Sequence, residues 1–261
     1  MRRPLQLALA MLFAFPLAAR ADDWQSLFNG KDLTGWKGRA DLWTVKDGAI
    51  TGYTKDGNIP GGNSFLVWDG KVADFELKAK FKIVGGNSGI QYRSKHVGEP
   101  DKFVIAGYQA DIDSAGKRKQ QFVGILYEER ARGFLCNRGT KTWIEANGTR
   151  HELAVTNGDE LLKSIKEDDW NEYHITACAN HLTHKINDKT TAEVIDWQTD
   201  KRAADGLLAF QIHAGMGEMT IQFKDIQLKK LTDCKEVTPE SLPIPPEAKK
   251  IEAPKPAPKK K

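Results

Sequence analysis

The sequence predicts an all-β fold, a jelly-roll sandwich of two antiparallel sheets with little helix. The clearest sign is the segment 75–83, FELKAKFKI, in which apolar residues alternate with charged ones, as in a strand with one buried face. About a dozen short strand-like segments with almost no helix indicate a sandwich or a barrel. No internal repeat is visible, which disfavours a propeller or a β-helix.

The other elements are assigned from the same patterns. Turn signals at Lys46-Asp47-Gly48 and Asn187-Asp188-Lys189 each separate two expected strands. One short helix is expected at 159–165, and 131–158 is poorly patterned, with loops and a short strand around Trp143. The further expected strands are 42–46, 49–53, 64–68, 89–94, 103–113, 121–129, 172–179, 182–187, 190–196, 206–213 and 218–230.

The basic charge of the chain belongs to its two ends. The net charge is +4, but residues 1–21 hold three arginines and no acid, and residues 235–261 hold seven lysines against four glutamates. Residues 22–234 therefore carry a net charge of −2. A nucleic-acid-binding domain concentrates basic charge in its fold, so that class is disfavoured.

Both ends are expected to lie outside the folded domain, which leaves 22–232. Residues 1–21 have Arg2-Arg3, an apolar run broken by Pro16 and an A-x-A site at 19–21, which together predict a signal peptide and a periplasmic or secreted protein. An uncleaved anchor is the alternative, although the run is short for a span. Seven of the eleven prolines lie between 239 and 258, so 233–261 is predicted to be a disordered Pro/Lys-rich tail, either a spacer or an adhesive segment.

The chain has three cysteines, Cys136, Cys178 and Cys234. An odd number cannot pair completely within one chain. One disulfide with one free thiol and three free thiols both fit an exported protein. No C-x-x-C pair suggests a zinc site.

Strand parity places polar side chains opposite the apolar ones on several strands. In 121–129 two phases are open: Tyr127 and Glu129 face outward if Phe122, Gly124 and Leu126 face the core, and otherwise Glu128 does. Amides, carboxylates and an aromatic wall suit a sugar ligand. The alternatives are a solvated sheet face, a strand-end role for His213 and an ion pair between Arg93 and Asp111. The face comprises Gln91, Arg93, Gln109, Asp111, Asp113, Gln211 and His213, with Tyr127, Glu128 and Glu129 from the strand of undecided phase.

An ordered set of motifs over roughly 25–231 resembles the 3-keto-disaccharide hydrolase family. The motifs are LFNGKDLTGW at 27–36, NSGIQYR at 87–93, GYQADI at 107–112, GILYEE at 124–129, WN at 170–171, QIH at 211–213 and FKDI at 223–226. The resemblance implies a concanavalin A-like jelly roll that acts, as a hydrolase or a 1,2-lyase with hydratase activity, on glycosides oxidised to a ketone at C3. Other branches carry Glu at the position of Gln109, so no role of that Glu transfers.

The implied substrate suggests a mechanism. A 3-keto group acidifies the C2 proton, so a base, an enolate stabiliser and an acid are needed. We assign His213 as the base, Arg93 as the enolate stabiliser, and Asp111 as the acid or as the residue that orients His213. A divalent metal held by Asp111, His213 and Glu128 or Glu129 would suit hard ligands, although nothing in the spacing demands it. The expected substrate contacts are Gln109, Tyr127, Gln211, Gln91, Asp113, Glu128 and Glu129.

Two rival functions remain open at this stage. One is a non-catalytic carbohydrate-binding module, which needs aromatic and amide groups but no base. The other is a surface or matrix protein that uses its basic tail. If the chain is an enzyme, an upstream sugar 3-dehydrogenase must supply the ketone, because no nicotinamide, flavin or nucleotide motif is visible.

Overall fold

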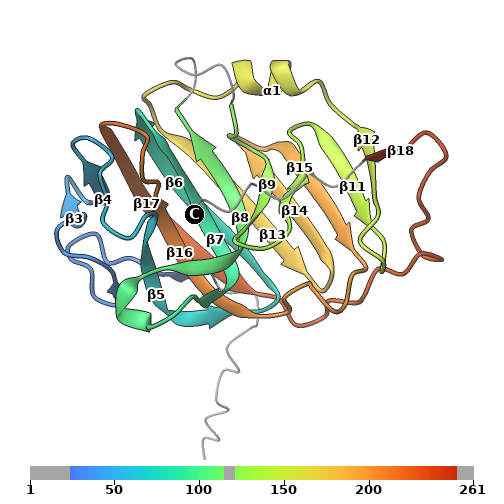
Figure 1. Cartoon of the computed structure of the whole chain (residues 1–261), viewed down its shortest axis with the longest axis horizontal. Coiled ribbons are helices and arrows are strands. Elements are labelled where there is room, and N and C mark those ends of the chain that lie inside the picture. Colours follow the sequence, from blue (N-terminus) through green and yellow to red (C-terminus); the bar gives the residue numbers. More distant parts are fainter. Residues whose placement is uncertain (1–23, 115–120, 252–261) are drawn as a thin grey trace, which may run out of the picture.

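The computed structural model describes residues 24–114 and 121–251, which form two packed layers of strands (Figure 1). The predicted signal peptide and residues 252–261 lie outside the described residues. The predicted jelly-roll sandwich is confirmed. A short helix, α1 (Gly158–Lys163), lies at one end of the sandwich, and a 3-10 turn spans Pro100–Lys102. Among the described residues no helix is long and apolar enough to cross a membrane.

The larger sheet has eleven strands, and β1 (Gln25–Ser26) joins it by pairing with β17. Its pairs are antiparallel, as predicted, except that of β11 with β15, which is parallel. The order of the other ten strands is β18 (Lys249–Ile251), β12 (Arg150–Ala154), β11 (Thr140–Ile144), β15 (Lys189–Asp196), β14 (His181–Ile186), β13 (Asn171–Cys178), β6 (Phe75–Val84), β17 (Met219–Lys230), β4 (Ala49–Thr54) and β3 (Trp43–Lys46).

The smaller sheet has seven strands and carries the predicted polar face. Its order is β10 (Gly133–Cys136), β9 (Leu126–Glu129), β8 (Ile105–Asp113), β7 (Asn87–His96), β16 (Gly206–Ile212), β5 (Ser64–Val72) and β2 (Trp36–Lys37).

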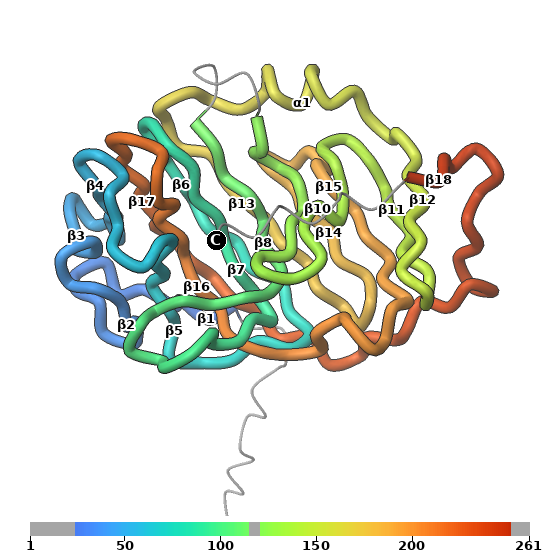
Figure 2. The backbone as a smooth tube through the Cα atoms, viewed as in Figure 1, coloured from blue at the N-terminus to red at the C-terminus, as the bar shows by residue number. Residues whose placement is uncertain are grey.

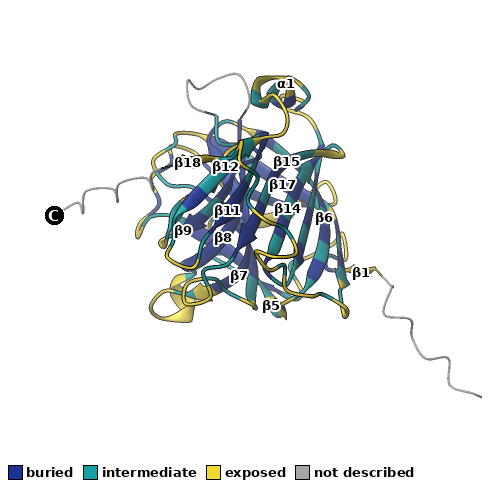
Figure 3. Cartoon of the chain, turned by 90° about the vertical axis from the view of Figure 1, so that its right-hand side faces the viewer, coloured by how far each residue is buried: buried dark blue, intermediate teal, exposed yellow. Residues whose placement is uncertain are grey.

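The alternation seen in the sequence of β6 is the alternation of its burial. Phe75 and Phe81 are at most 1% exposed, whereas Lys80 forms an ion pair with Asp225 at the outer surface. Figure 3 shows the same pattern across the sandwich, with buried segments between the layers. Burying one face of each strand against the other sheet supplies the main stabilisation of such a sandwich.

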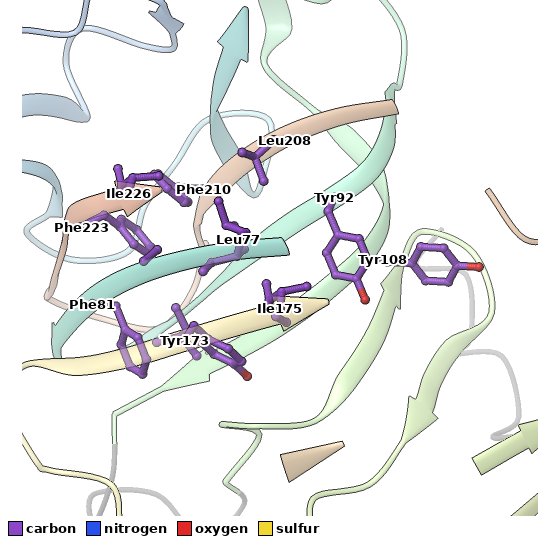
Figure 4. Close-up of a cluster of buried hydrophobic side chains, with 14 of the residues drawn as sticks. Leu77, Phe81, Tyr92, Tyr108, Tyr173, Ile175, Leu208, Phe210, Phe223 and Ile226 are labelled. Carbon is purple, nitrogen blue, oxygen red and sulfur yellow. The ribbon is translucent and has the colours of Figure 1, made fainter. Parts of the chain in front are cut away.

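Aromatic side chains from both sheets fill the core (Figure 4). Phe210 of β16 stacks on Phe223 of β17 with ring centroids 3.8 Å apart. The hydroxyl of Tyr92 on β7 contacts Nε2 of His184 on β14 at 2.9 Å. These contacts hold the two layers in one register, which positions the strand ends described below.

The two predicted turns close tight hairpins. Asp47 and Gly48 both have positive φ, as do Asn187 and Asp188. This left-handed conformation suits a two-residue hairpin and favours Gly, Asn and Asp.

The segment 131–158 is more ordered than its sequence pattern suggests. It contains β10, β11 and β12, where one short strand around Trp143 was expected. These strands are held by pairing with distant partners, since β11 pairs with β15 as well as β12. Such pairing leaves little trace in a local pattern. The helix α1 begins after Asn157, whose side chain accepts from two backbone N–H groups.

Residues 233–251 pack against the domain, which corrects the prediction of a disordered tail for this part of the chain. Cys234 forms a disulfide with Cys178, and Cys136 is a buried free thiol. The carbonyl of Val237 accepts hydrogen bonds from the side chains of Asn180 and Trp197. The chain then reaches the far edge of the larger sheet, where β18 pairs with β12 (Figure 2). Composition cannot reveal a disulfide partner or an edge pairing, which explains the error.

Candidate active site

The polar side chains predicted from parity meet on one face of the smaller sheet. Gln91 of β7 lies opposite Gln109 of β8, and Gln109 lies opposite Tyr127 of β9. Because cross-strand partners share a face, the three side chains lie side by side. On the other side of β7, β16 brings Gln211 beside them, with a contact of 3.5 Å between Gln211 Oε1 and Gln109 Nε2.

A pocket of about 220 Å³ opens on this face. Its volume is below the roughly 300–1,000 Å³ of sites for drug-sized ligands, which suits a single sugar ring. Five of the predicted site residues line it, namely Gln109, Asp111, Tyr127, Glu129 and His213. The remaining lining residues are Asn63, Asn87, Phe122, Phe134 and Met216.

Asp111 is the buried acid of the pocket. Its Oδ1 accepts a hydrogen bond of 2.8 Å from Asn87, and its backbone carbonyl accepts from the hydroxyl of Tyr173 in the other sheet. Burial raises its pKa to about 8, and the nearby carboxylates of Asp113 and Glu129 act in the same direction, against the hydrogen bonds from Asn87 and Gln109. Asp111 therefore holds a proton at neutral pH and can donate it.

His213 reaches the pocket from the end of β16. Its backbone N–H donates to the carbonyl of Asn87, and its Nδ1 lies 2.7 Å from the carbonyl oxygen of Ala214. A carbonyl can only accept, so in the neutral ring Nδ1 carries the hydrogen and Nε2 is the acceptor. The geometry therefore prepares Nε2 to take up a proton.

Two polar side chains, Ser94 and Gln91, orient the amide of Gln109. The hydroxyl of Ser94 donates to Oε1 of Gln91, and Nε2 of Gln91 donates to Oε1 of Gln109, both at 2.8 Å. Among the described residues, Nε2 of Gln109 has only long contacts, of 3.4 Å to Asp111 and 3.5 Å to Gln211. This amide can therefore donate to a ligand, while Gln91, which is fully buried and does not line the pocket, holds it in place.

Tyr127 and Glu129 settle the phase that the sequence left open. Leu126 is buried, and Tyr127 and Glu129, on the opposite face of the same strand, line the pocket. Burial raises the pKa of Glu129 and of the Tyr127 hydroxyl. Gln211 contacts Glu129 at 3.5 Å, and Asp113, which does not line the pocket, accepts from the backbone N–H of Phe122.

Arg93 does not belong to this site, which corrects its assignment as enolate stabiliser. Its side chain is 2% exposed, does not line the pocket and binds at the connections between strands. Its guanidinium donates to the carbonyls of Ala73, Ala179 and Ala203 and to the carboxylate of Asp74. Its ion-pair partner is thus Asp74, and the alternative pairing with Asp111 is also wrong.

A β-bulge explains why parity failed at Arg93. Tyr92 lies opposite Tyr108, but Lys95 lies opposite Ala106, so two residues of β7 face one of β8. Arg93 has a φ of 46°, and its side chain leaves the pocket face. A Cβ on Gly107 would lie 2.3 Å from the Ser94 hydroxyl oxygen, so the bulge requires glycine there, and this glycine is the sequence signal that could have revealed it.

Glu128 does not line the pocket either, because it lies between Tyr127 and Glu129 on the strand and so faces the opposite way. It points between the sheets and forms an ion pair of 2.6 Å with Arg132. Arg132 in turn pairs with Asp196 at 2.7 Å. Within 24–114 and 121–251 no three His, Cys, Asp or Glu side chains are grouped so as to hold a metal ion. Of the metal ligands suggested from the sequence, Glu128 lies outside the pocket.

Sequence reasoning missed the aromatic wall of the pocket. The ring of Phe134 packs edge to face on that of Tyr127, with ring centroids 5.1 Å apart, and its centroid lies 5.7 Å from that of Phe122. None of the seven tryptophans, all of them in described segments, lines the pocket. Phe122 lies in the strand of undecided phase and Phe134 in the poorly patterned segment, so the local pattern gave no signal for either.

A small pocket with amide, carboxyl and aromatic walls on one sheet of a jelly roll is typical of carbohydrate sites. The model of the 3-keto-α-glucoside-1,2-lyase-like domain matches residues 23–229. The chain therefore belongs to this family, as the resemblance in its motifs suggested.

Individual relatives agree with this assignment. A 3-keto-disaccharide hydrolase of Bacteroides thetaiotaomicron is 34% identical over 108 residues, which cover 37% of this chain and 36% of that protein. Two crystal structures from Parabacteroides distasonis, each assigned as a glycosyl hydrolase by inference, both align with a TM-score of 0.52 over 80% of this chain, at 16% and 20% identity. Their coverage is 100% and 94% of the solved chains, and at this identity they support the fold alone.

Proposed function

We propose that this protein cleaves 3-keto-glucosides or 3-keto-disaccharides by elimination followed by hydration. The observation that carries the proposal is one pocket lined by both a buried acid, Asp111, whose pKa is raised to about 8, and a histidine, His213, whose Nδ1 lies 2.7 Å from a carbonyl oxygen. Membership of the family supports the substrate class, as does the name of the Bacteroides relative.

The first step removes the C2 proton of the sugar. Nε2 of His213 takes this proton, and the electron pair of the C2–H bond forms an enolate with the C3 ketone. The pocket offers neutral amide donors for the enolate oxygen, and Nε2 of Gln109 is the one held ready by its partners. This replaces the role first given to Arg93.

The second step expels the substituent at C1. The enolate electrons form the C1–C2 double bond while the C1–O bond breaks, and Asp111 protonates the departing oxygen. Addition of water across the resulting enone returns a 3-keto sugar, so the overall result is hydrolysis. If the enone leaves first, the protein acts as a lyase.

Two further parts of the proposal concern the setting of the reaction. The disulfide Cys178–Cys234 is typical of an oxidising compartment, which supports export to the periplasm or beyond. The C3 ketone must be made before this step, so we place a sugar 3-dehydrogenase upstream.

The decisive test is incubation of the purified protein with an aryl 3-keto-glucoside. Enone absorbance and release of the aryl alcohol are expected to rise together, and the unoxidised glucoside should be stable. If the protein binds these sugars by calorimetry but turns none over, it is a carbohydrate-binding module and the proposal is wrong.

A further inference from the structure

A second pocket of about 330 Å³ adjoins the first. Asn63 lines both pockets, and the neighbours Glu129 and Arg130 line the first and the second respectively. A ligand that fills the first pocket can therefore extend directly into the second. The lining of the second pocket comprises Arg39, Pro60, Gly61, Gly62, Asn63, Ser64, Val97, Lys102, Val104 and Arg130.

The charged side chains that line this pocket are all cations. Arg39 is engaged by Asp41 through two hydrogen bonds of 2.6 and 3.1 Å. The other two are weakly held, since Lys102 lies 3.9 Å from Asp101 and Arg130 lies 4.0 Å from Glu129. Neither contact is a hydrogen bond at these distances, so both side chains have donors to offer.

Bare backbone forms another part of the same wall. Gly61 and Gly62 both line the pocket, with nothing within 4 Å of where a Cβ would be. These two glycines therefore leave room beside the cations for a polar group of a ligand.

We propose that the second pocket holds an anionic group, such as a carboxylate, carried by the part of the glycoside that leaves. This rests on the proposed function, because the first pocket is then occupied by the 3-keto ring. Lys102 and Arg130 supply the positive charge and the N–H donors for the anionic oxygens. Acidic glycosides are thereby preferred over neutral ones of the same shape.

A matched pair of substrates tests this preference. The 3-keto-glucosides of 4-hydroxybenzoate and of its methyl ester differ mainly in one charge. For the parent protein we expect kcat/KM to be about fivefold higher for the acid, the size of one exposed charge interaction, and to lose this advantage at high salt. Lys102→Gln should lower kcat/KM for the acid more than for the ester and so remove most of the preference.

Control variants and a binding measurement separate this proposal from the proposed function. Lys71→Gln, at an exposed lysine of β5 that does not line the pocket, should keep the preference, and Arg130→Gln should weaken it. Calorimetric binding of the two unoxidised glucosides reports on the pocket even if neither substrate is turned over. Equal binding and equal kcat/KM for acid and ester in the parent protein would overturn the inference.

Discussion

Arg93 and Asp111 lie on neighbouring strands of the same sheet, and both are buried charged residues, but their surroundings differ. Arg93 donates to three carbonyls and a carboxylate, so its charge is fully satisfied. Asp111 receives hydrogen bonds only from neutral amide side chains, at 2.8 and 3.4 Å, and its neighbours in charge are other carboxylates. Burial lowers the pKa of Arg93, but the acceptors around it suit only the charged guanidinium, whereas the surroundings of Asp111 favour its neutral form.

The difference shows how a structural charge can be told from a reactive one. A buried ion with a complete set of partners has no capacity left for a ligand and serves the fold. A buried acid with a raised pKa beside a histidine is the arrangement expected of a functional site. Both residues come from motifs of the family resemblance, so the motifs alone did not separate the two roles.

The largest expected effect is the loss of turnover in His213→Ala. If Nε2 is the base, kcat should fall by about 10²–10⁴-fold, while the melting temperature and sugar affinity change little because the side chain is only partly buried. The control is His174→Ala, which should keep its activity. His174 lies in the larger sheet, away from the pocket, and pairs there with Glu76. Turnover of His213→Ala at the parent rate would show that the site is assigned wrongly.

The opposite pattern is expected of Arg93. Arg93→Ala should lower the free energy of unfolding by roughly 3–5 kcal/mol, because several buried partners lose their donor. Arg93→Lys should recover only part of this loss, since an ammonium cannot reproduce the planar fork. Denaturant titration measures both, with the exposed Lys95→Ala of the same strand as control. A stable Arg93→Ala protein that has lost its turnover would return this residue to the catalytic mechanism.

A smaller loss of stability is expected when the C-terminal segment is removed. Truncation after Leu231 deletes the disulfide, β18 and the three hydrogen bonds of Val237. The disulfide alone closes a long loop and should contribute about 2–4 kcal/mol. Truncation after Ile251 keeps every described contact and is the control. Equal melting temperatures for the two truncated proteins would mean that residues 232–251 add nothing to the fold.

A pH dependence of stability is also expected from Asp111. Because its pKa rises from 3.8 to about 8 on folding, the folded state keeps a proton that the unfolded state releases between these values. Stability from this group is therefore present at low pH and is lost as the pH rises toward 8, by up to about 1.4 kcal/mol per pH unit. In Asp111→Asn this loss should be absent, so its melting temperature should fall less than that of the parent between pH 5 and pH 8. Parallel pH profiles would contradict the raised pKa.

The same mutation bears on the reaction itself. Turnover of the parent protein should decline above about pH 8, where Asp111 loses the proton that it donates to the leaving group. Asp111→Asn should lose turnover at all pH values, since an amide cannot act as this acid.

The fold class and most residues of the polar face could be predicted from the sequence alone. Alternation along strands such as β6 is set by one buried face, and the same parity correctly brought together Gln109, Asp111 and His213. This works because a regular strand turns by half a rotation at each residue, so the pattern of apolar residues fixes both faces at once.

Two features of the site could be read only from the folded chain: the position at which strand alternation fails, and the aromatic residues that complete the pocket. The bulge at Arg93 depends on Gly107 of the neighbouring strand, and the aromatic wall depends on how β10 folds back on β9. The partner of Cys178 and the place of β18 are likewise contacts between residues distant in the chain. Local periodicity carries no information on such pairings, because they are selected by the packing energy of the whole fold.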